Sequence, residues 1–254
     1  MKTLRPFIAL AVACAFALPC VPALTQTTDT SKTPIANEAL ERAIHDYILA
    51  HPEVLIQSLR IAKEREETRA AEQGKALLAS LKHELVDDPN APVRGNPSGD
   101  VTLVEFFDYR CPYCRQVEPF LQALLKNDHG LRVVVKEFPI LGPASVYAAK
   151  LALAANKQGK YELFHDAVMS RRSNFDEATL LKLAEEAGLA LDRLKTDMNS
   201  PEVDAEIKRT TEIAQALRLS GTPAFIVGTE LIPGATDPET LQALLDEARH
   251  GRTN

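Results

Sequence analysis

Tryptophan is absent from this sequence, and cysteine and glycine are uncommon. The 254 residues include four cysteines and 11 glycines, while 45% are hydrophobic and 25% are charged. This composition is typical of a helix-rich globular protein. The length favours one main core with an appendage rather than two full domains.

The sequence also lacks a block of basic residues. Its 29 basic and 35 acidic residues are spread along the chain and give a formal net charge of −6. A phosphate backbone is bound by clustered lysine and arginine. We therefore expect no nucleic-acid partner.

A hydrophobic run long enough to cross a membrane is missing, but a shorter one begins the chain. Lys2 and Arg5 precede an apolar run over residues 7–18, and small residues suit cleavage after Ala23. This layout is typical of a secretory signal peptide. We expect residues 1–23 to be removed and the protein to be released, with a lipoprotein signal at Cys20 as the alternative.

Removal of that segment would leave few cysteines. Cys14 and Cys20 lie within it, so the mature chain would keep only Cys111 and Cys114. An exported protein works where disulfide bonds persist. The pair is therefore the feature to explain.

Residues 24–90 are expected to form a helical arm. Asn37 can cap a first helix, and Pro52 begins a second one. The apolar positions expected to mediate self-association are Leu40, Ile44, Ile48, Leu55 and Leu59. Two short helices bury too little surface to be stable alone. We therefore expect a homo-oligomer, with a dimer favoured over a trimer; folding of the first helix back on its own domain is the alternative.

The segment 86–100 is rich in proline and glycine and indicates the end of the arm. We expect the catalytic domain to span residues 91–254. Its predicted elements are a strand at 101–107, a helix at 114–127, a strand at 131–138, a helical insertion at about 143–218, short strands at 222–228 and around Leu231, and a closing helix at 237–251. A strand, helix and strand in succession predict a parallel pair, and hence an α/β fold.

The sequence Cys111-Pro112-Tyr113-Cys114 follows the first predicted strand. A helix that begins here places Cys111 at its N-terminus, where unpaired amides and the helix dipole favour the thiolate. Pro112 suits the first helical turn. Cys114 lies one turn further on the same face, within reach of a disulfide. The spacing favours a reactive dithiol.

Other interpretations of the two cysteines were weighed. A structural disulfide across so short a loop would stabilise little. A zinc site lacks two ligands, since the six histidines show no paired spacing. A cysteine hydrolase would be inactivated by the second thiol. Copper binding by the two thiolates remains open, without a methionine-rich or histidine-rich tract to support it, as does a scaffolding surface protein with a vestigial dithiol.

Two further positions fit a redox site. Pro223 stands in a Gly-Thr-Pro turn before a predicted buried strand, and a cis bond after Thr222 would bring that backbone beside a substrate. Glu105 interrupts the apolar strand 101–107. A buried carboxylate is costly without a role or partner. We expect Glu105 to relay protons.

The motif "EFFDYRCPYC", followed far downstream by "GTPAF", resembles the DsbA family of thioredoxin-fold thiol-disulfide oxidoreductases. The stretches "IHDYILAHPEVLIQSL" and "KEFPILGP" resemble more narrowly the branch of ScsC and the Com1-like exported antigens, whose N-terminal helices oligomerise. The resemblance implies a thioredoxin fold with a helical insertion, preceded by the arm. It also implies a periplasmic enzyme.

The resemblance also implies roles for individual residues. Cys111 would be the attacking thiol, Cys114 the resolving thiol, Pro223 the cis-proline and Glu105 the buried acid. No cofactor beyond the dithiol and no metal are expected. The partners implied are secreted proteins with cysteines and a membrane protein, either a DsbB-like oxidant or a DsbD-like reductant. Tyr113 and Thr222 resemble the isomerases DsbC and DsbG, so oxidation and isomerisation both stay open.

Overall fold

The computed structural model describes residues 38–171 and 176–251, which form two compact units that divide after Ile61. The expected signal peptide, residues 1–23 with Cys14 and Cys20, lies outside the described residues. Among the residues that are described, no helix is both long and apolar enough to cross a bilayer.

The first unit consists of α1 (Glu38–Ala50) and the beginning of α2 (Pro52–Ser80). The break between the two helices falls at His51, because Pro52 starts the next helix at a position that needs no N–H. Every described residue of this unit is exposed. The five apolar positions predicted to mediate self-association are 38–63% exposed. The unit therefore has no core of its own.

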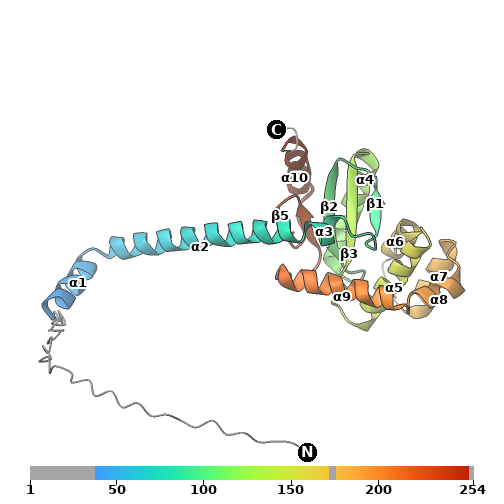
Figure 1. Cartoon of the computed structure of the whole chain (residues 1–254), viewed down its shortest axis with the longest axis horizontal. Helices are drawn as coiled ribbons and strands as arrows, with labels where there is room; N and C mark the ends of the chain where they lie inside the picture. The colour runs from blue at the N-terminus through green and yellow to red at the C-terminus, as the bar shows by residue number, and fades with distance from the viewer. Residues whose placement is uncertain (1–37, 172–175, 252–254) are drawn as a thin grey trace, which may run out of the picture. The chain divides into compact units, whose positions relative to one another are not determined.

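The second unit contains a five-stranded sheet in the order β1-β3-β2-β4-β5. Figure 1 labels β1, β2, β3 and β5. The strands are β1 (Val93–Gly95), β2 (Val101–Phe107), β3 (Leu131–Glu137), β4 (Ala224–Val227) and β5 (Glu230–Pro233). The central pair β2 and β3 is parallel, as predicted, and is joined by α4 (Pro112–Asn127). The other neighbours pair antiparallel.

Both faces of the sheet are covered, so its central strands are nearly continuous apolar runs. Leu103 and Phe107 of β2 face the larger core, with α4, the first helices of the insertion and α10 (Pro238–His250). Val104 and Phe106 face the smaller core, with α9 (Pro201–Ala216) and the end of α2. Alternation along β2 therefore assigns each residue to one layer.

The predicted helical insertion is present. Its helices are α5 (Pro143–Lys157), α6 (Tyr161–Met169), α7 (Glu177–Glu186), α8 (Leu191–Asp197) and α9. The sequence analysis gave the insertion as one range, about 143–218, without bounds for its helices. The shortest of them, α8, has seven residues, which make only about two turns and are too few for a clear apolar period.

The segment 86–100, expected to mark the end of the arm, holds more structure than predicted. Residues 93–95 form β1 within the 86–100 stretch, and α3 (Lys82–Val86) precedes it. Leu78 and Leu85 are buried in the smaller core beside Phe106. Packing on the sheet therefore begins N-terminal to residue 91, the expected start of the catalytic domain.

Candidate active site

Cys111 immediately precedes α4, with Pro112 in the first turn of the helix. Its N–H donates to the carbonyl oxygen of Asp108 at 3.0 Å. The Asp108 carboxylate accepts the N–H groups of Arg110 at 2.8 Å, Ile140 at 2.9 Å and Leu141 at 3.0 Å. One side chain thus joins the loop before Cys111 to the loop after β3.

The Thr222–Pro223 peptide bond is cis, as the Gly-Thr-Pro turn led us to expect. The thiol of Cys111 donates to the carbonyl oxygen of Thr222, with Sγ and O 3.1 Å apart. The two segments meet because β4, which begins at Ala224, pairs antiparallel with the end of β2. The structure therefore brings Cys111 and Pro223 together across more than one hundred residues.

The two thiols have different surroundings. Both are free, and Cys111 is 4% exposed whereas Cys114 is 0% exposed. Burial, and next to it the negative charge of Glu105, raise the pKa of Cys114. The thiolate of Cys114 is therefore disfavoured unless a neighbouring group takes its proton.

Glu105 lies on β2 between Leu103 and Phe107, whose side chains belong to the same core cluster as Cys114. Because side chains alternate along a strand, Glu105 points toward α4. It is fully buried, and neither carboxylate oxygen has a hydrogen-bond partner among the described residues. Burial and the charge of Glu118, opposed by Arg94, raise its pKa to about 8.

Tyr113, the second residue between the two cysteines, is 59% exposed. It lines a surface hollow together with residues 219–222 and 233–235. Thr222 belongs to this hollow and also holds the thiol of Cys111. The dithiol motif therefore borders a depression that an extended peptide could occupy.

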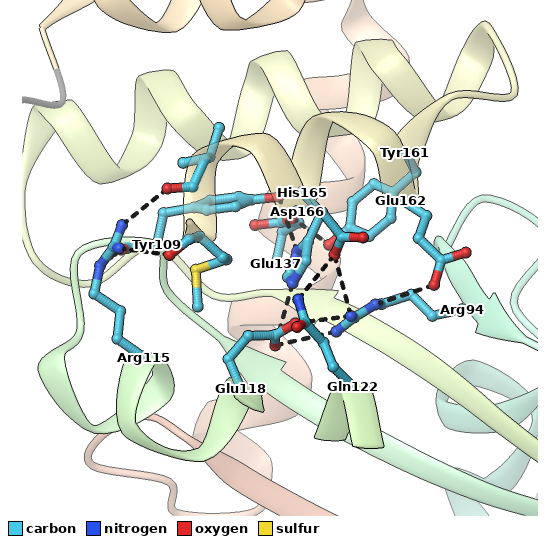
Figure 2. A network of polar contacts seen from close by, with 12 residues as sticks. Arg94, Tyr109, Arg115, Glu118, Gln122, Glu137, Tyr161, Glu162, His165 and Asp166 are labelled. Carbon is cyan, nitrogen blue, oxygen red and sulfur yellow. Dashed lines mark hydrogen bonds and ion pairs between the residues drawn. The ribbon is translucent and has the colours of Figure 1, made fainter. Parts of the chain in front are cut away.

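A buried polar network beside the dithiol helix was not predicted (Figure 2). Arg94 of β1 donates two hydrogen bonds to Glu118 of α4, at 2.8 and 3.1 Å. His165 Nε2 of α6 lies 3.3 Å from Glu118 Oε2. Burial raises the pKa of Glu118, but His165 and Arg94 together outweigh burial and hold this pKa at about 2. Glu118 is therefore a carboxylate inside the protein.

The network continues to the ends of the central strands. Tyr109, just after β2, has its hydroxyl 3.2 Å from His165 Nδ1. Tyr161 donates to Glu137, the last residue of β3, at 2.8 Å. Burial raises the pKa of Glu137 well above its usual range. Glu137 is thus a second buried acid, on the strand next to Glu105.

Glu118, His165 and Asp166 bring potential metal ligands within 4.8 Å of one another. Arg94, however, already places a positive charge there, since its guanidinium lies 2.8 Å from Glu118 and 3.5 Å from Asp166. We assign no metal to this cluster. Glu118 follows Cys114 by four residues, a spacing that would have put it on the same helix face, but nothing in the proline-rich stretch indicated a buried Arg94.

Comparison with known proteins gives a consistent picture. Residues 102–246, more than half of the chain, match the family described as the DSBA-like thioredoxin domain. The chain is 33% identical over 165 residues to the Na(+)/H(+) antiporter NhaA 3 of Salinispora tropica, covering 64% of this chain and 25% of the antiporter. It therefore spans about a quarter of the length of such relatives. It is 29% identical over 146 residues to the thiol:disulfide interchange protein DsbA of Bordetella parapertussis, covering 55% and 68%.

Solved structures agree with this fold. A thioredoxin-like oxidoreductase from Silicibacter pomeroyi is 48% identical with a TM-score of 0.64, and the match covers 66% of this chain and 97% of that one. The catalytic domain of Proteus mirabilis ScsC is 25% identical with a TM-score of 0.63, covering 69% and 98%. The second likeness agrees with the narrower resemblance drawn from the sequence.

Proposed function

Because the chain belongs to the DSBA-like thioredoxin domain family, we propose that it is an exported protein thiol-disulfide oxidoreductase that forms or rearranges disulfide bonds in secreted proteins. The contact between the Cys111 thiol and the Thr222 carbonyl oxygen, beside cis-Pro223, is the observation that supports this most strongly. It puts a thiol at a helix start next to a backbone that a bound peptide could pair with.

The proposed reaction proceeds through a mixed disulfide. When the protein rearranges disulfides, the Cys111 thiolate attacks a client disulfide, and a client thiolate that re-pairs displaces Cys111; a client that does not re-pair is released when Cys114 attacks Cys111. When the protein forms disulfides, a client thiolate attacks Cys111 of the enzyme disulfide and a second client thiolate then displaces Cys111, so that the client loses two electrons and the enzyme is left as the dithiol. Glu105 takes up the proton that Cys114 must lose before it attacks. The pair Cys111 and Cys114 is the only redox group that this reaction needs, so no separate cofactor is proposed.

The direction of electron flow depends on the resting state. An oxidase must rest as the disulfide and be re-oxidised by a DsbB-like membrane partner. An isomerase must rest as the dithiol and be reduced by a DsbD-like partner. Tyr113 and Thr222 favour the second mode through their resemblance to DsbC and DsbG, and an exported chain would meet either partner in the periplasm.

The exposed apolar residues of α1 and α2 support self-association, in which the five predicted positions from Leu40 to Leu59 contact a second copy. Such a patch is unusual on a monomer. A dimer would present two dithiols to one client, which suits rearrangement of wrong disulfides.

Copper binding is the alternative use of the same dithiol. Cu(I) would be held by two thiolates. The burial of Cys114 and the raised pKa of its thiol disfavour the second thiolate. Copper storage would need both thiolates at rest, whereas disulfide exchange needs the Cys114 thiolate only during the resolving step, so the site supports exchange better than copper storage.

The test is to trap the thiol state of the protein in acid-quenched cells, then to assay the purified protein on reduced and on scrambled ribonuclease. An isomerase is expected to be reduced in cells and to reactivate the scrambled substrate. An oxidase is expected to be oxidised in cells and to act on the reduced substrate. Failure to exchange disulfides with either substrate would contradict the proposed function.

A further inference from the structure

The turn after α9 holds an arginine at a position where helices usually place glycine. Arg218 has a φ of 56°, in the left-handed region, and in the described part of the chain every other residue with a positive φ is a glycine. Its N–H donates to the carbonyl oxygen of Gln215 at 3.0 Å, and the N–H of Leu219 donates to that of Ala214 at 2.8 Å. Helices often end with this pair of bonds around a glycine, because a side chain strains the left-handed conformation. The arginine is therefore an exception that requires an explanation.

The contacts of the fold do not explain this arginine. Leu217 is buried in the smaller core and Leu219 packs against it, whereas Arg218 between them is exposed. Within residues 38–171 and 176–251, the guanidinium of Arg218 makes no hydrogen bond or ion pair. The side chain thus lies outside the core, and its charge is available to a partner.

The segment that follows Arg218 leads into the active site. Residues 219–222 line the hollow beside the dithiol, and the carbonyl oxygen of Thr222 lies 3.1 Å from Cys111 Sγ. Four residues span at most about 14 Å when fully extended, so the α-carbons of Arg218 and Thr222 lie within that distance. A client cysteine bonded to Cys111 would therefore bring its neighbouring residues close to the guanidinium.

The charges around the hollow leave Arg218 without a competitor for a bound carboxylate. The residues that line the hollow are all uncharged. The acids on either side of its second segment, 233–235, have partners within the fold. Glu230 pairs with Lys75 at 3.1 Å, and Asp237 caps α10 by accepting a backbone N–H at 2.7 Å. An arginine binds a carboxylate through charge-assisted hydrogen bonds. A carboxylate of a bound client is therefore the partner that fits Arg218.

We propose that Arg218 is a specificity-determining residue that favours client proteins with acidic side chains close to the reacting cysteine. The inference rests on the proposed function and names the substrate class of the same site. In the first step the Cys111 thiolate attacks a client sulfur, a bond forms between these two sulfurs, and the second client sulfur leaves as a thiolate. Arg218 takes no part in this exchange of bonds. It attracts the client before the attack, which raises the rate of encounter.

The experiment compares three short peptides that differ only in the residues flanking a central cysteine: glutamate, glutamine or lysine on both sides. The cysteine of each peptide is linked by a disulfide to thionitrobenzoate. Attack of reduced Cys111 on the peptide sulfur releases the coloured thiolate, and its absorbance gives the rate. At low ionic strength the parent protein should react with the glutamate peptide roughly threefold faster than with the glutamine peptide. The difference should disappear at about 1 M salt, because salt screens exposed charges.

Variants of Arg218 test whether this charge is the cause. Arg218→Lys should keep the preference, Arg218→Gly should lose it, and Arg218→Glu should reverse it toward the lysine peptide. Lys208→Gln is the matched control, because it removes one positive charge from the same helix. Lys208 is 77% exposed and lies eight residues before Ala216, the end of α9, which is about 12 Å along the helix axis. This variant should keep the preference of the parent protein.

A purely structural role makes the opposite forecast. A cation at the C-terminus of a helix interacts favourably with the helix dipole, so Arg218→Gly would then lower the urea midpoint and leave the peptide preference unchanged. We expect a midpoint at least as high as that of the parent protein, because glycine suits the left-handed conformation.

Equal rates of the parent protein with all three peptides would overturn the inference and leave the proposed function standing. A preference that Arg218→Gly keeps, or that Lys208→Gln loses, would overturn it in the same way. A parent protein that reacts with none of the peptides would overturn the proposed function as well.

Discussion

The two cysteines carry the same side chain, and their positions make them different reagents. Cys111 stands at the start of α4 with its thiol on the Thr222 carbonyl oxygen, whereas Cys114 is fully buried and its pKa is raised by burial and by Glu105. A thiol attacks a client only when it can reach it as a thiolate. We therefore expect Cys111 to make the first attack.

We expect Cys114→Ala to accumulate mixed disulfides with client proteins, because the internal resolving thiol is gone. Cys111→Ala should accumulate none and serves as the control. Non-reducing gels of acid-quenched cells, followed by reduction of the trapped species, give the measurement. Trapping by Cys111→Ala together with none by Cys114→Ala would reverse the assignment.

The burial of Glu105 lowers the stability of the protein, by an amount that depends on pH. Its pKa is about 8 in the folded protein against an ordinary value of 4.5. Between these values the folded protein keeps the proton and the unfolded chain releases it, so this residue lowers stability as pH rises from about 4.5 to 8. Above about pH 8 the loss of stability caused by Glu105 reaches its full size, and below about pH 4.5 this loss disappears.

We therefore expect Glu105→Gln to stabilise the protein at pH 8, by an amount on the order of a few kcal/mol, and to change little at pH 4.5. The same variant should slow the resolution of mixed disulfides. Urea unfolding at the two pH values measures the change in stability. The decay rate of a preformed mixed disulfide between Cys111 and a cysteine peptide measures the change in resolution. Equal stability changes at both pH values would show that Glu105 is not held neutral.

At the scale of elements, the sequence predicted what periodicity and spacing encode. The strands β2 and β3 with α4 between them followed from two apolar runs and one helical pattern, and Cys111, Glu105 and Pro223 followed from residue types in unusual places. Arg94 could not be found in this way. Arg94 lies on a three-residue strand, which is too short to show a period in the sequence. Its buried positive charge is compensated by Glu118 and by acidic residues of α6, which are distant in sequence.

A second buried ion cluster joins elements on the other face of the sheet. Lys136 of β3 is 0% exposed and lies 2.7 Å from Asp88 and 3.6 Å from Glu206 of α9. Arg209 lies 3.4 Å from both acids. The cluster therefore holds α9 and the segment before β1 against the strand that leads toward the active site.

Lys136→Met should lower the free energy of unfolding by ~3–5 kcal/mol, because it leaves two buried acids with a single cation. Lys150→Met is the matched control. Lys150 pairs with Asp204 of α9 at 2.6 Å, but at the surface, where such a pair contributes ~0–1 kcal/mol. Urea unfolding compares the two variants. A loss of the same size in both would mean that the buried cluster is not specifically stabilising.

At the scale of the whole molecule, the first unit has apolar side chains that nothing within the unit covers. None of its residues from 38 to 61 is buried, although many are apolar. Burial of such side chains contributes ~1.5–3 kcal/mol each, so a second copy of the unit is the natural cover. The exposure of these apolar side chains in one chain is therefore our reason to expect an assembly of several chains.

We expect the mature chain to be a homo-oligomer, favoured as a dimer, and the double variant Ile44→Glu with Leu59→Glu to be a monomer. Gln57→Glu with Ser58→Glu adds the same charge at polar positions and should leave the assembly intact. Light scattering measures the mass. Each protein should still exchange disulfides, since the dithiol is untouched.

Deletion of residues 24–60 should likewise give a folded monomer, and it should lose the ability to rearrange scrambled ribonuclease while oxidising reduced ribonuclease. A monomer offers one dithiol for one encounter, whereas rearrangement requires the client to be retained. A mature chain that is already monomeric, or a truncated one that rearranges the substrate equally well, would contradict this account.

The Asp108 carboxylate, which holds three backbone N–H groups from two loops, also bears on how the protein would cycle. These contacts involve no sulfur atom, so we expect the backbone of the loops around Cys111 to keep its conformation whether Cys111 is a free thiol, bonded to Cys114 or bonded to a client. The catalytic cycle would then change the bonds of the sulfur atoms and leave the surrounding backbone in place. In the NMR spectra of the reduced and oxidised protein, we expect the amide signals of Ile140 and Leu141 to coincide while those of the two cysteines move.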